Sequence, residues 1–253
     1  MDRLAVISAQ SQRLVDVLAG VDPDRRCPTC PDWSAADLLW HLTEVHLFWG
    51  AILARNILSS NELLDIQEAK PARPQSWVDL VALRTDATDK LVKELAAKGD
   101  EEPLWSWWPA DQTVGFTRRM QTYEATMHRV DAELAAGLPI TPIAADVAAG
   151  AIDHVVDVMW DPMPADGDYR AEAIVELVAT DIDQRWLVET GRWAGSNGSG
   201  RRAVRAQSAT ARATVAGTVE QLALWAWTRD DQVTLAGEVD AVESIKSVVK
   251  QGI

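Results

Sequence analysis

The sequence predicts two domains, an all-α domain over residues 1–163 followed by a small α+β domain over residues 164–253. Three observations support this division. Apolar residues recur at helical spacing through the first half, a stretch rich in proline and aspartate interrupts the pattern at residues 161–168, and short apolar runs typical of strands follow it. A breaker of this composition is typical of a domain boundary.

Five helices are predicted before the breaker. Ser34 with Asp37, and Ser76 with Asp79, have the spacing of capping boxes and mark two helix starts. Pro142 directly after Thr141 marks another start, because proline is favoured in the first turn of a helix. The predicted helices cover residues 2–20, 34–53, 77–98, 117–136 and 141–160.

The second half alternates between predicted strands and helices, which is the pattern of an α+β domain. Residues 196–200, Ser-Asn-Gly-Ser-Gly, are predicted to be a flexible turn. The predicted strands cover residues 173–180, 185–190, 210–215 and 233–237, and the predicted helices cover residues 219–228 and 240–249.

Composition limits the classes of function. The formal net charge of −14 opposes binding to phosphate backbones, so we expect no nucleic-acid partner. There is no basic amphipathic patch and no apolar run of about 18 residues, so we expect no membrane association. Residues 1–6 do not have the pattern of an export signal, and we therefore expect a cytoplasmic protein.

His41, Glu124 and His128 are candidate metal ligands. Positions four apart on a helix lie about 40° from each other, so Glu124 and His128 share a face. His41 comes from a distant helix, and two imidazoles with one carboxylate can leave positions open for water or substrate. The alternatives are that His41 is an ordinary core residue and that Glu124 pairs with a histidine or with an arginine, for which the candidates are Arg118, Arg119 and Arg129.

The other histidines and the cysteines are weaker candidates. His46 lies about 140° around the helix from His41 and should not share its ion, and His154 is interpreted as structural. Cys27 and Cys30 form a C-x-x-C motif that can be a redox pair or half of a zinc site, although the segment before it looks helical. Two unreactive loop thiols are the alternative.

Twelve tryptophans are spread along the chain, and three of them lie in a predicted loop. We expect these three to pack on the helices or to line the mouth of a pocket, and they are Trp105, Trp107 and Trp108.

Two segments resemble signatures of the mycothiol-dependent maleylpyruvate isomerase family. The first is residues 30–42, CPDWSAADLLWHL, and the second extends from Trp107-Trp108-Pro109 through residues 123–132, YEATMHRVDA. The resemblance implies a DinB-like four-helix bundle and a C-terminal domain similar to sterol-carrier-protein folds. Two residues depart from the family pattern: Tyr123, which precedes the glutamate, and Cys27, which is an additional cysteine.

The resemblance also implies a site. A divalent metal, usually zinc, would be held by His41, Glu124 and His128, and Arg229 would be a catalytic arginine from the C-terminal domain. Mycothiol would be the thiol cosubstrate, and a small electrophile would be the substrate. The predicted function is therefore a metal-dependent isomerase or S-transferase that uses a low-molecular-weight thiol.

Two alternatives stay open. The protein could bind a small apolar or acidic ligand without turnover, or it could carry out thiol redox chemistry at Cys27 and Cys30.

Overall fold

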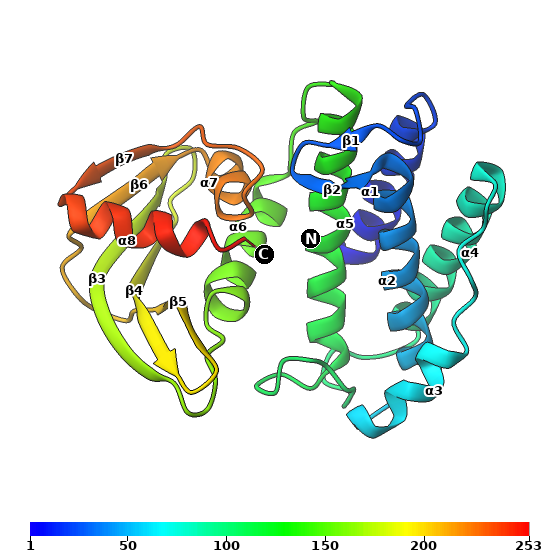
Figure 1. Cartoon of the computed structure of the whole chain (residues 1–253), viewed down its shortest axis with the longest axis horizontal. Coiled ribbons are helices and arrows are strands. Elements are labelled where there is room, and N and C mark those ends of the chain that lie inside the picture. The colour runs from blue at the N-terminus through cyan, green and yellow to red at the C-terminus, as the bar shows by residue number, and fades with distance from the viewer. Residues whose placement is uncertain (253) are drawn as a thin grey trace. The chain divides into compact units, whose positions relative to one another are not determined.

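The computed structural model describes residues 1–252, which form two compact units, Met1–Thr141 and Pro142–Ile253 (Figure 1). The division falls after Thr141, not after residue 163 as the sequence predicts. The reason is helix α6 (Ala145–His154), which packs against α7 (Val219–Ala226) within the second unit. Apolar periodicity predicts a helix in this stretch, but it does not say which neighbours that helix packs against.

The first unit is helical. Its long helices are α1 (Arg3–Leu18), α2 (Ala35–Arg55), α4 (Trp77–Ala96) and α5 (Val114–Ala136). Helix α1 packs against α5 and α2 packs against α4, while α2 also contacts α5. A 3₁₀ turn, η1 (Ser60–Glu62), and a short helix, α3 (Leu63–Glu68), follow α2 and were not expected from the sequence.

The helix boundaries follow local hydrogen bonding. Ser34 and Asp37 form the predicted capping box at the start of α2. Helix α5 begins earlier than predicted, because the side chain of Thr113 accepts a hydrogen bond from the Phe116 backbone N–H and caps it there. It ends at Ala136, and the capping residue Gly137 has a φ of 69°, which lies in the left-handed region that favours glycine.

Residues 26–34 form a hairpin that was not expected from the sequence, whereas the helix predicted before the cysteines is confirmed as α1, which ends at Leu18. Strand β1 (Arg26–Cys27) pairs antiparallel with β2 (Cys30–Ser34), and Cys27 lies directly opposite Cys30. Pro28 and Thr29 occupy the turn, where the fixed φ of proline favours reversal of the chain. This hairpin precedes α2 directly, and it contacts both α2 and α5.

The second unit contains a five-stranded sheet with strand order β5-β4-β3-β6-β7. Strands β3 and β6 are parallel, and the other neighbours are antiparallel. The strands are β3 (Asp168–Ala179), β4 (Arg185–Gly195), β5 (Gly198–Arg205), β6 (Ala213–Gly217) and β7 (Thr234–Gly237). Helix α6 continues as a π-helical turn, η2 (Val155–Met159), and α8 (Val239–Val249) is the last helix.

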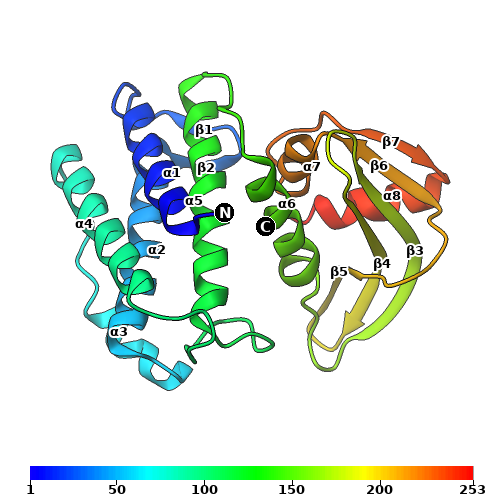
Figure 2. The same ribbon diagram turned by 180° about the vertical axis from the view of Figure 1, so that it is seen from behind.

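Helices cover one face of this sheet. Alternate residues of β3, namely Ala173, Val175, Leu177 and Ala179, are buried, while those between them are partly exposed. Helix α8 lies across that sheet in both views (Figures 1 and 2).

Strand β5 was not predicted from the sequence, because its glycines and its serine carry little strand signal. Only residues 196 and 197 form the turn, since Gly195 pairs with Gly198.

The helical unit followed by a mixed unit confirms the predicted order of all-α and then α+β. The finer likenesses to a DinB-like bundle and to sterol-carrier-protein folds stay predictions. Within residues 1–252, no helix is long and apolar enough to cross a membrane.

Candidate metal centre

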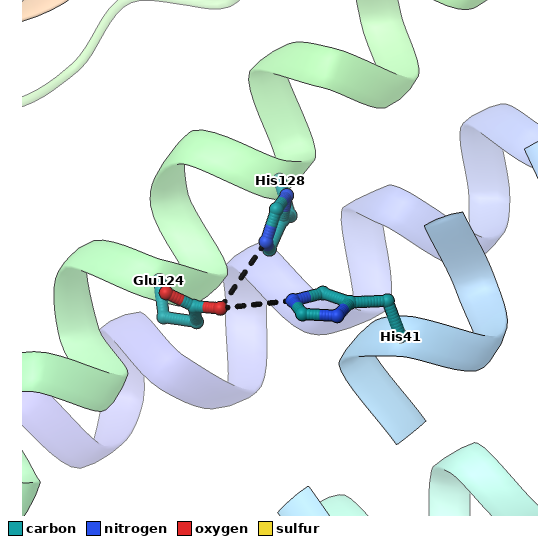
Figure 3. A group of neighbouring side chains, drawn as sticks. All are labelled: His41, Glu124 and His128. Atoms are coloured by element: carbon teal, nitrogen blue, oxygen red, sulfur yellow. Dashed lines mark hydrogen bonds and ion pairs between the residues drawn. The ribbon is translucent and has the colours of Figure 1, made fainter. Parts of the chain in front are cut away.

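Helices α2 and α5 bring His41, Glu124 and His128 together (Figure 3). The Glu124 Oε1 atom lies 3.1 Å from His41 Nε2 and 3.2 Å from His128 Nε2. One potential ligand atom from each residue lies within 4.8 Å of the other two. The structure therefore gathers the three predicted side chains into one cluster, although His41 and Glu124 are 83 residues apart along the chain.

Asp131 fixes how His128 presents its ring. Its Oδ2 atom lies 2.8 Å from His128 Nδ1, and Asp131 is fully buried. The carboxylate can only accept a hydrogen bond, so it favours the ring form with the hydrogen on Nδ1. In the neutral ring this leaves a lone pair on Nε2. That lone pair faces the lone pairs of Glu124, and two such acceptors at hydrogen-bond distance require a proton or a cation between them. The donor set therefore fits a bound cation.

The charges in the cluster are strongly coupled. Burial acts to lower the pKa of His128, but the Glu124 and Asp131 carboxylates outweigh burial and raise that pKa to about 9. Burial acts to raise the pKa of Glu124, but the charge of His128 and hydrogen bonds from both imidazoles hold it well below its ordinary value. The carboxylate is thus ionised near neutral pH, as a metal ligand must be.

The β1–β2 hairpin completes the surroundings of the cluster. Thr29 donates a hydrogen bond of 2.5 Å from its hydroxyl to Asp131 Oδ1, and the Cys30 thiol lies 3.9 Å from Asp131 Oδ2. The Trp33 ring lies with its centroid 4.5 Å from that of His41. The hairpin therefore holds the buried carboxylate in place and supplies one aromatic wall.

One side of the cluster is accessible. The side chains of His41 and Glu124 are 31% and 24% exposed, whereas His128 is 9% exposed and Asp131 is not exposed. A ligand can therefore approach from the side of His41 and Glu124, while His128 and Asp131 form the buried base of the cluster.

The alternative of a Glu124–arginine pair is not supported, because each candidate arginine has other partners. Arg118 donates to the Leu95 and Lys98 carbonyls, Arg119 pairs with Asp111, and Arg129 pairs with Glu133.

The remaining histidines lie outside the cluster. His46 Nδ1 lies 2.9 Å from Thr88 Oγ1 in the buried core, and burial lowers the pKa of His46 to about 3. His154 is buried in the second unit and stacks on Trp227.

Cys27 has little thiolate character. Neither cysteine forms a disulfide, and Cys27 is fully buried. Burial, followed by the charge of Asp131, raises the pKa of Cys27 to about 12. A thiol must ionise to attack a disulfide or bind a metal, so this environment opposes the redox hypothesis.

Two of the three loop tryptophans, Trp105 and Trp107, contact residues of the helices. The ring of Trp105 stacks on that of Trp49, with centroids 5.8 Å apart, and Trp107 Nε1 lies 3.1 Å from the sulfur of Met120. Of the two expectations for this loop, packing on the helices is the one that the structure supports.

Arg229 follows α7 in the second unit. Its backbone N–H donates to the Leu224 carbonyl and its guanidinium donates to the Trp227 carbonyl, at 2.7 and 2.6 Å. These contacts place it at the C-terminal end of the helix. Its catalytic role stays a prediction.

Asp131 is the functional candidate that the sequence analysis missed. The signal was available in the spacing, since Asp131 follows Glu124 and His128 by seven and three residues and therefore lies on the same helix face. A carboxylate near a metal-binding histidine is a common orienting partner.

Fold and site together define a two-domain protein whose helical unit carries a cluster of two histidines and one carboxylate. The chain belongs to the mycothiol maleylpyruvate isomerase N-terminal domain family, whose sequence model matches residues 4–133, just over half of the chain. A search of curated proteins finds no significant match.

Solved structures give the same fold over both units. The crystal structure of the mycothiol-dependent maleylpyruvate isomerase matches with a TM-score of 0.62 and 15% sequence identity, covering 94% of this chain and 93% of that chain. The crystal structure of a histidine-to-alanine mutant of that isomerase matches equally well. At this identity the likeness establishes the fold alone.

Proposed function

We propose that this protein is an enzyme in which His41, Glu124 and His128 hold a divalent cation, zinc by preference, and in which mycothiol reacts with a small electrophile. The observation that carries the proposal is the convergence of these side chains from two helices, in a chain that belongs to this family. Two imidazoles and a carboxylate suit zinc and leave a coordination position open.

A bound cation with an open position would lower the pKa of an incoming thiol and so supply a thiolate nucleophile near neutral pH. The protein's own residues prepare this position. Asp131 keeps the hydrogen of His128 on Nδ1, so that Nε2 points its lone pair at the centre of the cluster. The side chains of His41 and Glu124 are partly exposed, so the thiol and the electrophile would approach the cluster from their side.

The proposed reaction begins with addition of the thiol sulfur to an electron-poor carbon–carbon double bond. One C–S bond forms, the double bond becomes single, and a proton is taken up at the neighbouring carbon. Rotation about that single bond, followed by loss of the same proton and the same thiol, gives the trans isomer and regenerates mycothiol. Retention of the C–S bond would instead be S-transfer. We propose Arg229 as the partner of a substrate carboxylate.

The test is an assay of the purified protein with maleylpyruvate, with and without mycothiol, after chelation and after reloading with zinc. We expect loss of the cis substrate only when both zinc and mycothiol are present. Mass spectrometry of the products separates isomerisation from S-transfer, since only the second leaves a thiol adduct. Turnover that persists at the full rate in the chelated protein would contradict the proposed role of the cation.

Asp131 provides a prediction about cation affinity. We expect Asp131→Ala to weaken zinc binding by about 10–100-fold, because the His128 ring loses the partner that fixes its tautomer. Competition with a chromophoric chelator measures this change. Asp131→Asn, which keeps the shape of the side chain, should give a smaller loss, and Thr29→Val should be smaller still because it removes only one contact to Asp131. Equal affinity in Asp131→Ala and the wild type would contradict the orienting role.

The alternative of a non-catalytic binding protein has lost one of its supports, because the tryptophan loop packs on the helices. It remains the outcome to accept if mycothiol or maleylpyruvate stabilises the protein against heat and no product forms with any thiol.

A further inference from the structure

We propose that the second unit contains a binding site for a small, multiply charged oxyanion. Its base is a row of three arginines on neighbouring strands, which we call the arginine row. Arg170 of β3 pairs directly with Arg192 of β4, and Arg192 pairs directly with Arg201 of β5. Because directly opposite residues lie on the same face of a sheet, the three side chains share one face.

The arginine row forms one wall of a pocket of about 420 Å³. The opposite wall is a stripe of α8 that contains Asp240, Glu243, Ser244 and Ser247, which are spaced as one helix face. Helix α8 also contacts β3, β4 and β5. The pocket therefore lies within a single unit of the chain, and it is independent of the candidate metal centre.

Like charges directly opposite each other on neighbouring strands are destabilising. In the arginine row this repulsion is only partly offset. Glu172 pairs with Arg192, and it pairs with Arg201 at 2.6 Å. The Arg170 side chain has no hydrogen-bond or ion-pair partner within residues 1–252. One carboxylate thus faces three guanidinium groups, and the row lacks negative charge.

The carboxylates near the arginine row do not supply the missing negative charge. The hydroxyl of Ser244, which is buried, lies 3.0 Å from Glu172 Oε2 and 2.8 Å from Thr190 Oγ1, so Glu172 is held at Arg192 and Arg201. The acids of α8 have other cationic partners. Arg212 donates to Asp240 at 2.7 Å and also to Glu238 just before the helix, and Lys246 donates to Glu243 at 2.7 Å.

The missing charge indicates the chemical class of the ligand. Guanidinium groups bind carboxylate and phosphate oxygens through paired hydrogen bonds, so a ligand with two or more such groups would satisfy Arg170 and share the neighbouring arginines. The pocket size limits the ligand to a small molecule. A polymeric anion such as a nucleic acid is disfavoured, because Asp240 and Glu243 line the same pocket and the chain carries a formal net charge of −14.

Calorimetric titration of the chelator-treated full chain tests the site. The probes are pyrophosphate and citrate, with acetate as the singly charged comparison, all at constant ionic strength. We expect saturable binding with one site per chain for pyrophosphate, citrate or both, and none for acetate. A preference between the first two distinguishes a phosphate ligand from a carboxylate ligand. No saturable binding of either, or equal binding of acetate, would overturn the proposal.

The matched variants are Arg170→Gln and Arg185→Gln. Both positions lie on the same sheet, but Arg185 pairs with Glu176 and does not line the pocket. Arg170→Gln should weaken binding by about 10-fold or more, since a hydrogen bond to a charged group is lost, while Arg185→Gln should bind as the wild type does. Equal binding by Arg170→Gln and the wild type contradicts the site, as does equal weakening by both variants.

Two controls keep these results interpretable. The Arg170 side chain makes no hydrogen bond or ion pair within residues 1–252, so the ligand-free Arg170→Gln protein should melt at or above the wild-type temperature. If it melts lower, Arg192→Gln takes its place. The titration is repeated with His41→Ala, whose binding should be unchanged. Loss of binding in that variant would place the anion at the candidate metal centre and overturn the proposal.

Discussion

Replacing His41 or His128 with alanine is expected to remove stoichiometric zinc from the purified protein. Each substitution deletes one of the three side chains whose ligand atoms converge within 4.8 Å. Loss of an orienting partner alone lowers metal affinity about 10–100-fold, so loss of a ligand should lower it by more than about 100-fold. Metal analysis of protein dialysed against a dilute chelator, with circular dichroism to confirm folding, measures the effect.

The matched control is His46→Asn. His46 lies on the same helix as His41, but its ring is buried against Thr88 and takes no part in the cluster. Asparagine can place its amide N–H where His46 has Nδ1, so the contact to Thr88 can persist. This variant should keep its zinc. If folded His41→Ala and His128→Ala also keep theirs, the cluster is a buried hydrogen-bonded group and the proposed function loses its basis.

The same site should bind zinc more tightly as the pH rises. The pKa of His128, raised to about 9 by Glu124 and Asp131 against the effect of burial, means that the metal-free ring is protonated near neutral pH. Zinc must displace that proton. Affinity measured by chelator competition should therefore increase from about pH 6 toward pH 9 and then level off.

The second large effect concerns stability. Glu133 is fully buried, and its two oxygens accept hydrogen bonds from Arg129, Arg13 and Thr141 at distances of 2.6 to 3.0 Å. Glu133→Ala would leave Arg129, which is 1% exposed, as an unpaired buried cation. We expect a loss of about 3–5 kcal/mol in the free energy of unfolding, as measured by urea denaturation.

Two variants test this expectation. Glu133→Gln keeps the shape and should lose less than Glu133→Ala. Arg13→Ala removes the partly exposed partner, which is 44% exposed, and should cost at most about 1 kcal/mol. A loss in Glu133→Ala no larger than that of Arg13→Ala would show that the buried pair does not stabilise the helical unit.

The contribution of Glu133 should also depend on pH. Burial acts to raise its pKa, but the hydrogen bonds from Thr141 and Arg129 outweigh burial and hold the pKa below the ordinary value of 4.5. A carboxyl whose pKa is depressed in the folded state stabilises the fold above its unfolded pKa, and that stabilisation is lost as the pH falls through the folded value. The difference between wild type and Glu133→Gln should therefore shrink below pH 4.5.

Local patterns were enough to predict the elements that hold the candidate metal centre. The capping box at Ser34 and the apolar spacing after it predict α2, and the four-residue interval between Glu124 and His128 places both on one face of α5. That His41 lies on the facing helix could not be obtained from periodicity. It came from the family resemblance, because helix packing is a non-local property.

Features that depend on pairing between strands could not be predicted. The arginine row exists only through the register that sets Arg170 opposite Arg192 and Arg192 opposite Arg201, and β5 itself was hidden by glycine and serine. The hairpin at Cys27 and Cys30 is too short to show alternation. The assignment of α6 to the second unit depends on its contact with α7, which no local pattern records.

The position of the cluster between α2 and α5 has a consequence for the survival of the protein. A cation there would act as a crosslink that closes a long loop, since His41 and Glu124 are 83 residues apart. Whatever binds only the folded chain protects it from unfolding by mass action. Under the proposed function, zinc starvation would thus shorten the lifetime of this protein through proteolysis, and its abundance would follow the supply of the metal.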